Sequence, residues 1–72
     1  MKATINYKGM DYENVELASI KQTIVSFRVY TNEPNYHESI ERLVNDGADA
    51  DFYNEYAFII VLRENVTSII YL

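Results

Sequence analysis

The stretch TIVSFRVYT, residues 23–31, alternates between apolar and polar side chains along its whole length. A period of two is typical of a β-strand that buries one face and leaves the other in contact with water. We therefore predict a strand here, with Val25, Phe27 and Val29 facing the core and Arg28 among the residues of the opposite face.

The preceding stretch, residues 2–17, predicts a β-hairpin. Lys8 and Gly9 lie between two strand-like segments, and glycine adopts the positive φ that a tight two-residue turn requires. Residues 17–23 are compatible with a turn or with a bulged continuation of the strand. A short helix over residues 14–22 is a third, less favoured reading.

The segment NEPNYHESIERLVNDG, residues 32–47, carries the signals of a helix. Asn35 and Glu38 have the spacing of a capping box, and Gly47 is placed to end the helix in the left-handed conformation. Apolar residues recur at helical spacing and predict one apolar stripe along the helix. The stripe consists of Tyr36, Ile40, Leu43 and Val44.

The last segment, residues 56–72, predicts a second hairpin that turns at Glu64 and Asn65. Residues 57–62 are apolar on both faces, which is typical of an interior strand covered on both sides. The whole chain, residues 1–72, is thus expected to form a single α+β domain. We predict an antiparallel sheet of four to five strands with one helix packed on one face, in the order βββαββ.

This architecture leaves the second face of the sheet without a covering layer. It would display residues such as Ile24 and Tyr30, and an exposed apolar patch of this kind usually marks an interface. Unless the sheet curls strongly, we expect a homodimer or a partner protein to cover it.

The chain has 72 residues, no cysteine and a formal net charge of −5. Residues 33–55 hold seven acids and one base, so the excess of negative charge lies in this third of the chain. Such a field disfavours direct binding to nucleic acid or anionic membranes and attracts basic partners. Because no apolar run is long enough to span a bilayer and no signal peptide is evident, we expect a cytoplasmic protein.

The residues that usually carry catalysis are scarce. The chain has one histidine, His37, and none of its acids lies inside an apolar run that would raise a carboxyl pKa. A calcium loop with Gly47 at its sixth position would place Arg42 at the first ligand position, so that template fails. We therefore expect no enzymatic activity, no metal site and no cofactor.

The stretch DGADADFYNEY, residues 46–56, combines carboxylates with aromatic rings. It reads either as a solvated loop that keeps the protein dispersed or as a binding surface, in which charge steers a basic partner and the rings anchor it. On the second reading, acids of the predicted helix join the loop in one negative ridge. The predicted partner-binding residues are Glu38, Glu41, Asp46, Asp49, Asp51, Phe52, Tyr53, Glu55 and Tyr56.

A short, acidic, cysteine-free α+β chain rich in Asn and Tyr, with segments such as KGMDYENVEL and RVYTNE, resembles the small accessory proteins of bacteriophages and mobile elements. Several anti-CRISPR inhibitors belong to this group, and some of its members are acidic and occupy nucleic-acid sites on their targets. The resemblance covers the overall composition of the chain.

These observations predict a non-enzymatic, phage-encoded interaction protein that inhibits a nucleic-acid-binding target by nucleic-acid mimicry. Its partner would be a protein with a basic surface, such as a nucleic-acid-binding enzyme. The alternative is a structural or assembly module, such as a virion or scaffold component. That module would act through an exposed sheet face and the terminal strand VTSIIYL, residues 66–72.

Overall fold

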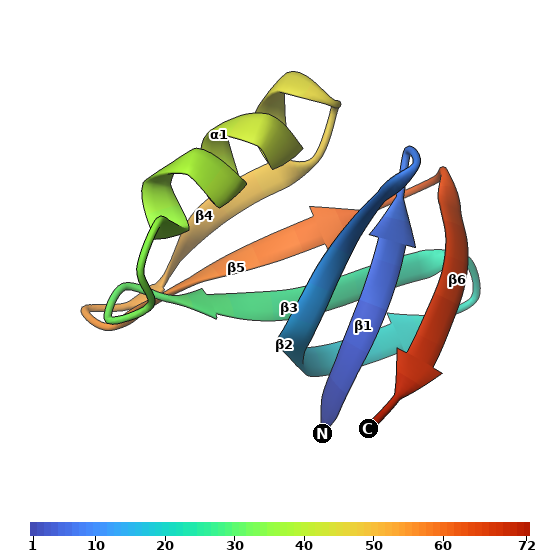
Figure 1. The fold of residues 1–72 in the computed structure, drawn as a ribbon, viewed down its shortest axis with the longest axis horizontal. Helices are drawn as coiled ribbons and strands as arrows, with labels where there is room; N and C mark the ends of the chain where they lie inside the picture. The colour runs from blue at the N-terminus through green and yellow to red at the C-terminus, as the bar shows by residue number, and fades with distance from the viewer.

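A computed structural model describes the whole chain, from Met1 to Leu72, as one helix packed on one antiparallel sheet (Figure 1). The α+β class is confirmed, but the sheet has six strands, one more than the predicted order contained. The elements are β1 (Lys2–Tyr7), β2 (Met10–Lys21), β3 (Ile24–Tyr30), α1 (Tyr36–Asn45), β4 (Asp49–Asn54), β5 (Ala57–Leu62) and β6 (Val66–Tyr71).

The additional strand is β4, formed by residues that the sequence analysis treated as a loop. Its side chains alternate, so that Ala50 packs against the core while Asp49 and Asp51 are exposed. β4 pairs with β5 alone and forms one edge of the sheet. An edge strand tolerates charged residues because one of its faces and one of its sides remain in water.

The predicted C-terminal hairpin is wrong. The strand order is β4-β5-β3-β2-β1-β6, so β5 lies between β3 and β4 while β6 pairs with β1 at the far edge. Both sides of β5 are already hydrogen-bonded, which leaves no place for β6 beside it. Residues 63–65 instead cross from β5 to β6, and the Lys8 N–H donates to the Asn65 carbonyl at 3.1 Å.

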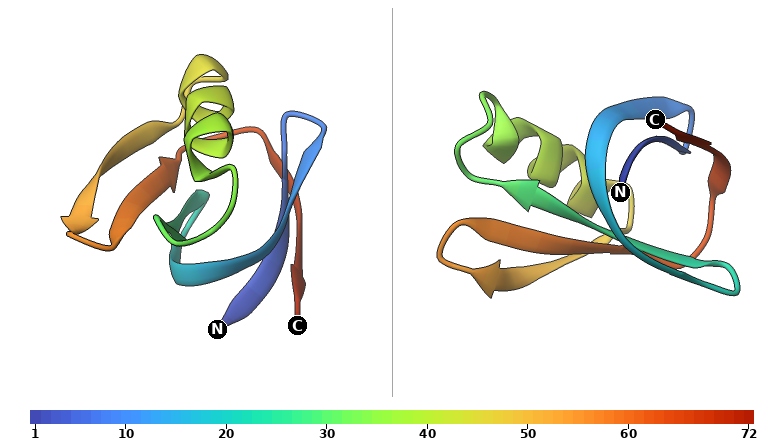
Figure 2. Two further views of the ribbon diagram at one scale, coloured as in Figure 1. Left: turned by 60° about the vertical axis from the view of Figure 1, so that its left-hand side comes forward. Right: turned by 90° about the horizontal axis from the view of Figure 1, so that it is seen from below.

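In the uncertain stretch at residues 17–23, β2 continues as a bulged strand to Lys21, and Gln22 and Thr23 form the turn to β3. The first half of β2 pairs with β1 and its second half with β3, with a register shift between Leu17 and Ser19. Bulges increase the local twist and bend of a strand. The sheet accordingly curls, with β4 and β5 on one side and β1 and β6 on the other, and α1 lies between the two sides (Figure 2).

The two ends of α1 differ in how well the sequence predicts them. Asn35 adopts a left-handed conformation with φ 64° and makes no side-chain cap, so the expected capping box is absent. Gly47, with φ 105°, ends the helix as predicted. The Gly47 N–H donates to the Val44 carbonyl at 3.0 Å and the Ala48 N–H to the Leu43 carbonyl at 2.9 Å. This pair of bonds is a Schellman motif.

The core lies on the concave face of the curled sheet, beneath α1. Phe27 and Leu43 are fully buried there, and Val25 and Val29 face inward as predicted. On the convex face of β5, Ile59 and Val61 are only partly buried, so β5 is interior within the sheet but is covered on one face alone. The single helix, of ten residues, is too short and polar to cross a membrane.

Candidate functional site

Six of the nine predicted partner-binding residues lie on β4 and the turn that follows it. We call this group the acidic–aromatic edge; it consists of Asp49, Asp51, Phe52, Tyr53, Glu55 and Tyr56. The turn is held in place by backbone contacts. The Asn54 side-chain oxygen accepts the Tyr56 N–H at 2.8 Å, and the Tyr56 carbonyl accepts the Thr31 N–H at 2.8 Å.

Three aromatic rings of this edge are exposed to solvent. The exposed fractions are 75% for Phe52, 53% for Tyr53 and 66% for Tyr56. Phe52 stacks on Phe58 with ring centroids 4.9 Å apart, and Phe58 lies 6.4 Å from Tyr36 of α1. One side of the Phe52 ring is therefore supported by the fold, while most of its surface remains free to contact another molecule.

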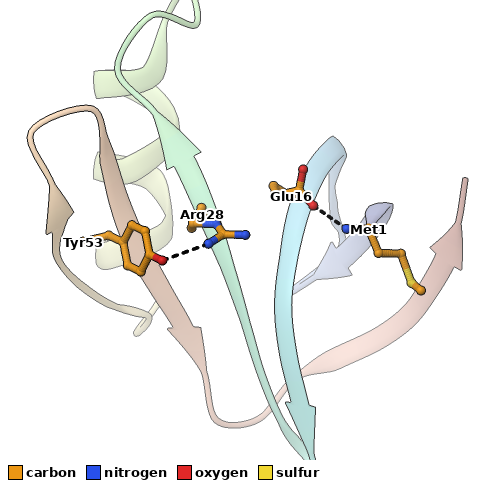
Figure 3. A network of polar contacts seen from close by, with 4 residues as sticks. All are labelled: Met1, Glu16, Arg28 and Tyr53. Atoms are coloured by element: carbon orange, nitrogen blue, oxygen red, sulfur yellow. Dashed lines mark hydrogen bonds and ion pairs between the residues drawn. The ribbon is translucent and has the colours of Figure 1, made fainter.

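The convex face of the sheet holds Tyr53 against Arg28. The Arg28 Nη1 donates to the Tyr53 hydroxyl at 3.2 Å, and the guanidinium carbon lies 5.1 Å from the ring centroid, within the range of a cation–π contact (Figure 3). Near the start of β4, Asp49 pairs with Arg63 at 3.0 Å between Oδ2 and Nε. The convex face thus combines both signs of charge rather than carboxylates alone.

Glu16 belongs to the same face, directly opposite Arg28 in the pairing of β2 with β3. The amino group of Met1 donates to the Glu16 carboxylate (Figure 3). This hydrogen bond, together with the positive charges of the amino group, Lys2 and Arg28, lowers the pKa of the Glu16 carboxyl in spite of partial desolvation. Glu16 therefore remains ionised and balances Arg28 on this face.

Glu38 and Glu41 are exposed on α1, which lies over the concave face of the sheet. Asp49, Asp51 and Tyr53 project from the convex face, because alternate residues of a strand point to opposite sides. The nine predicted residues are therefore divided between two faces that meet at β4, and the single ridge expected from the sequence does not form.

Asp46 has a structural contact that the sequence did not indicate. Its backbone carbonyl accepts the hydroxyl of Tyr7 at 2.8 Å, which ties β1 to the end of α1. Burial, and then the nearby charges of Asp46, Glu64 and Asp49, raise the pKa of the Tyr7 hydroxyl. Stability that depends on the protonated hydroxyl is complete below the unfolded pKa of about 10 and is lost as the pH rises above it.

We expect Tyr7→Phe to lower the free energy of unfolding by about 0.5–1.5 kcal/mol at neutral pH, because a partly buried hydrogen bond is lost. Above pH of about 10 the difference in unfolding free energy between the two proteins should shrink. Tyr7 then ionises in the unfolded wild type but stays protonated in the folded one, and this ionisation stabilises the unfolded state of the wild type alone. Urea titrations at both pH values measure this, with Tyr56→Phe as an exposed control. A difference independent of pH would contradict the assignment.

Arg28 and Arg63 contact residues of the acidic–aromatic edge, and the sequence pattern did not indicate these contacts. The alternation of residues 23–31 places Arg28 on the face opposite the core, but its contact with Tyr53 depends on β4 being a strand. Likewise, Arg63 reaches Asp49 only because the end of β5 lies beside the start of β4.

The surface also has three hollows, the two larger of about 480 and 520 Å³. A cavity of about 140 Å³ between β2 and α1 is lined by Asp11, Glu13, Glu33 and Arg42, among others. His37 packs against Tyr36 with ring centroids 4.0 Å apart. No three Asp, Glu or His side chains come together as a set of metal ligands.

The acidic–aromatic edge is thus the surface where exposed rings and carboxylates occur together. Comparison with protein-family models, curated proteins and solved structures finds no match to this chain.

Proposed function

We propose that this protein is a non-enzymatic interaction protein that inhibits a nucleic-acid-binding target by occupying the target's basic surface. The observation that carries the proposal is the exposure of Phe52, Tyr53 and Tyr56, each by more than half, on one edge of the sheet. Packing of the core does not explain why aromatic residues occupy these exposed positions, and solubility would favour polar residues there. Aromatic rings in such positions are the usual anchors of protein interfaces.

The charges around these rings define the partner. Only Glu16 and Asp49 among the acids form ion pairs, so the charges of Asp51 and Glu55 are not neutralised within the chain. Asp51 Oδ1 accepts the Phe52 N–H at 2.8 Å, which leaves its second oxygen for basic groups of another molecule. Carboxylates presented along an edge compete for the lysine and arginine side chains that bind phosphates. Charge then steers the encounter, and the rings supply the desolvated contacts.

The resemblance in composition to small phage accessory proteins, including anti-CRISPR inhibitors, agrees with this mode of action. In this proposal the chain acts in the cytoplasm of a bacterial host as a mimic of nucleic acid. Glu38 and Glu41 are exposed on α1, over the concave face, and lie outside the acidic–aromatic edge.

A second candidate function is that of a structural or assembly module. It is favoured by the exposure of Ile70, Tyr71 and Leu72 at the opposite edge of the sheet. In this case the protein would associate with other subunits through β6, and the acidic–aromatic edge would serve solubility.

Capture of binding partners from a bacterial lysate on the immobilised protein, at low and at high salt, distinguishes the two candidate functions. We expect the double variant Asp51→Lys/Glu55→Lys to bind the captured target at least about ten-fold more weakly, because the charge at the interface changes by +4. Glu13→Lys/Glu33→Lys changes the net charge equally at exposed positions elsewhere and should retain binding.

The captured target should also lose its own binding to nucleic acid when the wild-type protein is added. Equal binding by both double variants would contradict an acidic–aromatic interface. A captured protein that is insensitive to salt and has no nucleic-acid-binding activity would instead favour the assembly module.

A further inference from the structure

A row of aromatic rings crosses from α1 to β4 on the concave side of the sheet. Phe52 of β4 stacks on Phe58 of β5, with ring centroids 4.9 Å apart and ring planes inclined by 27°. The Phe58 ring lies 6.4 Å from the ring of Tyr36, which in turn lies 4.0 Å from the ring of His37, and both of these residues belong to α1. We call these four residues the aromatic ladder.

The two inner rings of the ladder are packed, and the two outer rings are open to solvent. Tyr36 and Phe58 are half-buried and lie against the hydrophobic core. His37 is exposed, and Phe52 is exposed by 75%. Because one face of the Phe52 ring rests on Phe58, its free surface is the opposite face. A ring that the fold already supports loses little conformational entropy when another group stacks on it.

The charges in this part of the chain favour a cation as the group that stacks on Phe52. Three of the four ladder residues lie within residues 33–55, which hold seven acids and one base. Glu38 and Glu41, on the same helix as His37, are exposed and form no ion pair. An anion would be repelled by this field, and an apolar partner would desolvate carboxylates without pairing them. A cation is attracted both by the carboxylates and by the negative face of an aromatic ring.

We propose that the aromatic ladder binds arginine side chains of the basic target, with a guanidinium stacked on the free face of Phe52. This contact rests on the proposed function, because it names the side chain through which the target would bind. A guanidinium is flat and weakly hydrated, so it stacks on a ring while its N–H groups bind carboxylates. A lysine ammonium is strongly hydrated and would be held by the carboxylates alone. Phe52 has no polar side-chain atom, so it contributes to binding only through its ring surface.

The protein itself contains one contact of this kind. The guanidinium carbon of Arg28 lies 5.1 Å from the ring centroid of Tyr53, and Arg28 Nη1 donates to the Tyr53 hydroxyl at 3.2 Å. Tyr53 is thus supplied with a cation from within the chain, on the convex face. Phe52 lies on the concave side, where its ring contacts Phe58 and no cation of the chain lies over it. The Phe52 ring therefore remains open to a cation from another molecule.

Titration calorimetry at low salt with two capped peptides of equal length and charge, octa-arginine and octa-lysine, tests the proposal. The wild type should bind octa-arginine about two- to five-fold more tightly than octa-lysine, which is the effect of one cation–π contact at an exposed site. Phe52→Leu leaves every charge in place and should bring the two affinities together. Tyr71→Leu is the matched control and should keep the preference, because Tyr71 is 54% exposed on β6, a strand without charged residues.

A wild type that binds the two peptides equally would overturn the proposal, as would a Phe52→Leu variant that keeps the full wild-type preference. NMR of the wild type gives a second measurement that needs no variant, because an aromatic ring shifts the resonances of protons that lie over its face. The δ protons of octa-arginine should move upfield on binding. Absence of this shift would likewise exclude the stacking contact.

The double variant Asp51→Lys/Glu55→Lys tests the proposed function separately and should weaken the binding of both peptides by a similar factor. If it does so while the wild type shows no preference for arginine, the stacking contact is excluded and the proposed function stands. If the double variant binds both peptides as tightly as the wild type, basic partners do not use the acidic–aromatic edge. The proposed function then fails, together with the contact that rests on it.

Discussion

Replacing Phe27 by alanine is expected to leave the chain largely unfolded at room temperature. Phe27 is fully buried and lies in β3, between Leu17 of β2 and Ile60 of β5. Removal of a buried phenylalanine side chain costs about 3–5 kcal/mol, because both the transfer free energy and the lost packing contribute. A core of this size supplies a total of only about 3–5 kcal/mol.

Urea titration followed by far-ultraviolet circular dichroism measures this loss. Phe52→Ala is the matched control, since it removes the same side chain from an exposed site where one stacking contact with Phe58 is made. An aromatic pair contributes about 0.5–1.5 kcal/mol, so the control should remain folded. Similar losses at Phe27 and Phe52 would mean that β3 is not the centre of the core.

Replacing Leu43 by alanine is expected to unfold helix and sheet together, with a loss of about 2–5 kcal/mol. Leu43 is the one residue of α1 that is fully buried, and its carbonyl also accepts the Ala48 N–H that ends the helix. A helix of ten residues is not stable by itself in water, so it persists only while it is packed on the sheet.

Val44→Ala is the neighbouring control, because Val44 lies on the same helix but is about half exposed. We expect it to cost less than about 1 kcal/mol, in line with an aliphatic truncation at a partly exposed site. Helical and tyrosine signals should be lost in one transition for Leu43→Ala. A variant that loses the helix signal and keeps the sheet signal would show that α1 is an independent unit.

The elements that could be predicted are those with a local signal. The alternation around Phe27 identified β3 and its buried face, and the apolar stripe of α1 identified the helix together with its anchor, Leu43. Lys8 and Gly9 form the expected turn, with φ angles of 51° and 81°. In each case a backbone conformation or a periodicity is encoded within a few adjacent residues.

The candidate site was predicted in composition but not in shape. Its residues alternate, as Asp49 and Asp51 on one face and Phe52 on the other, which is a strand pattern. The density of aspartates, which favour turns, obscured that pattern. The division of the acids between two faces then follows from the pleat of the strand, and from the position of α1 over the concave face.

The sequence alone indicated the class of the fold, the helix and its C-terminal end at Gly47, the buried face of β3 and the residues from which a binding surface can be built. Only the tertiary structure decided which strands pair. β5 and β6 are neighbours in the chain, yet β3 and β4 occupy both sides of β5, so β6 pairs with β1. Pairing depends on which edges remain free once the whole sheet has formed, and that is not written in any local stretch of residues.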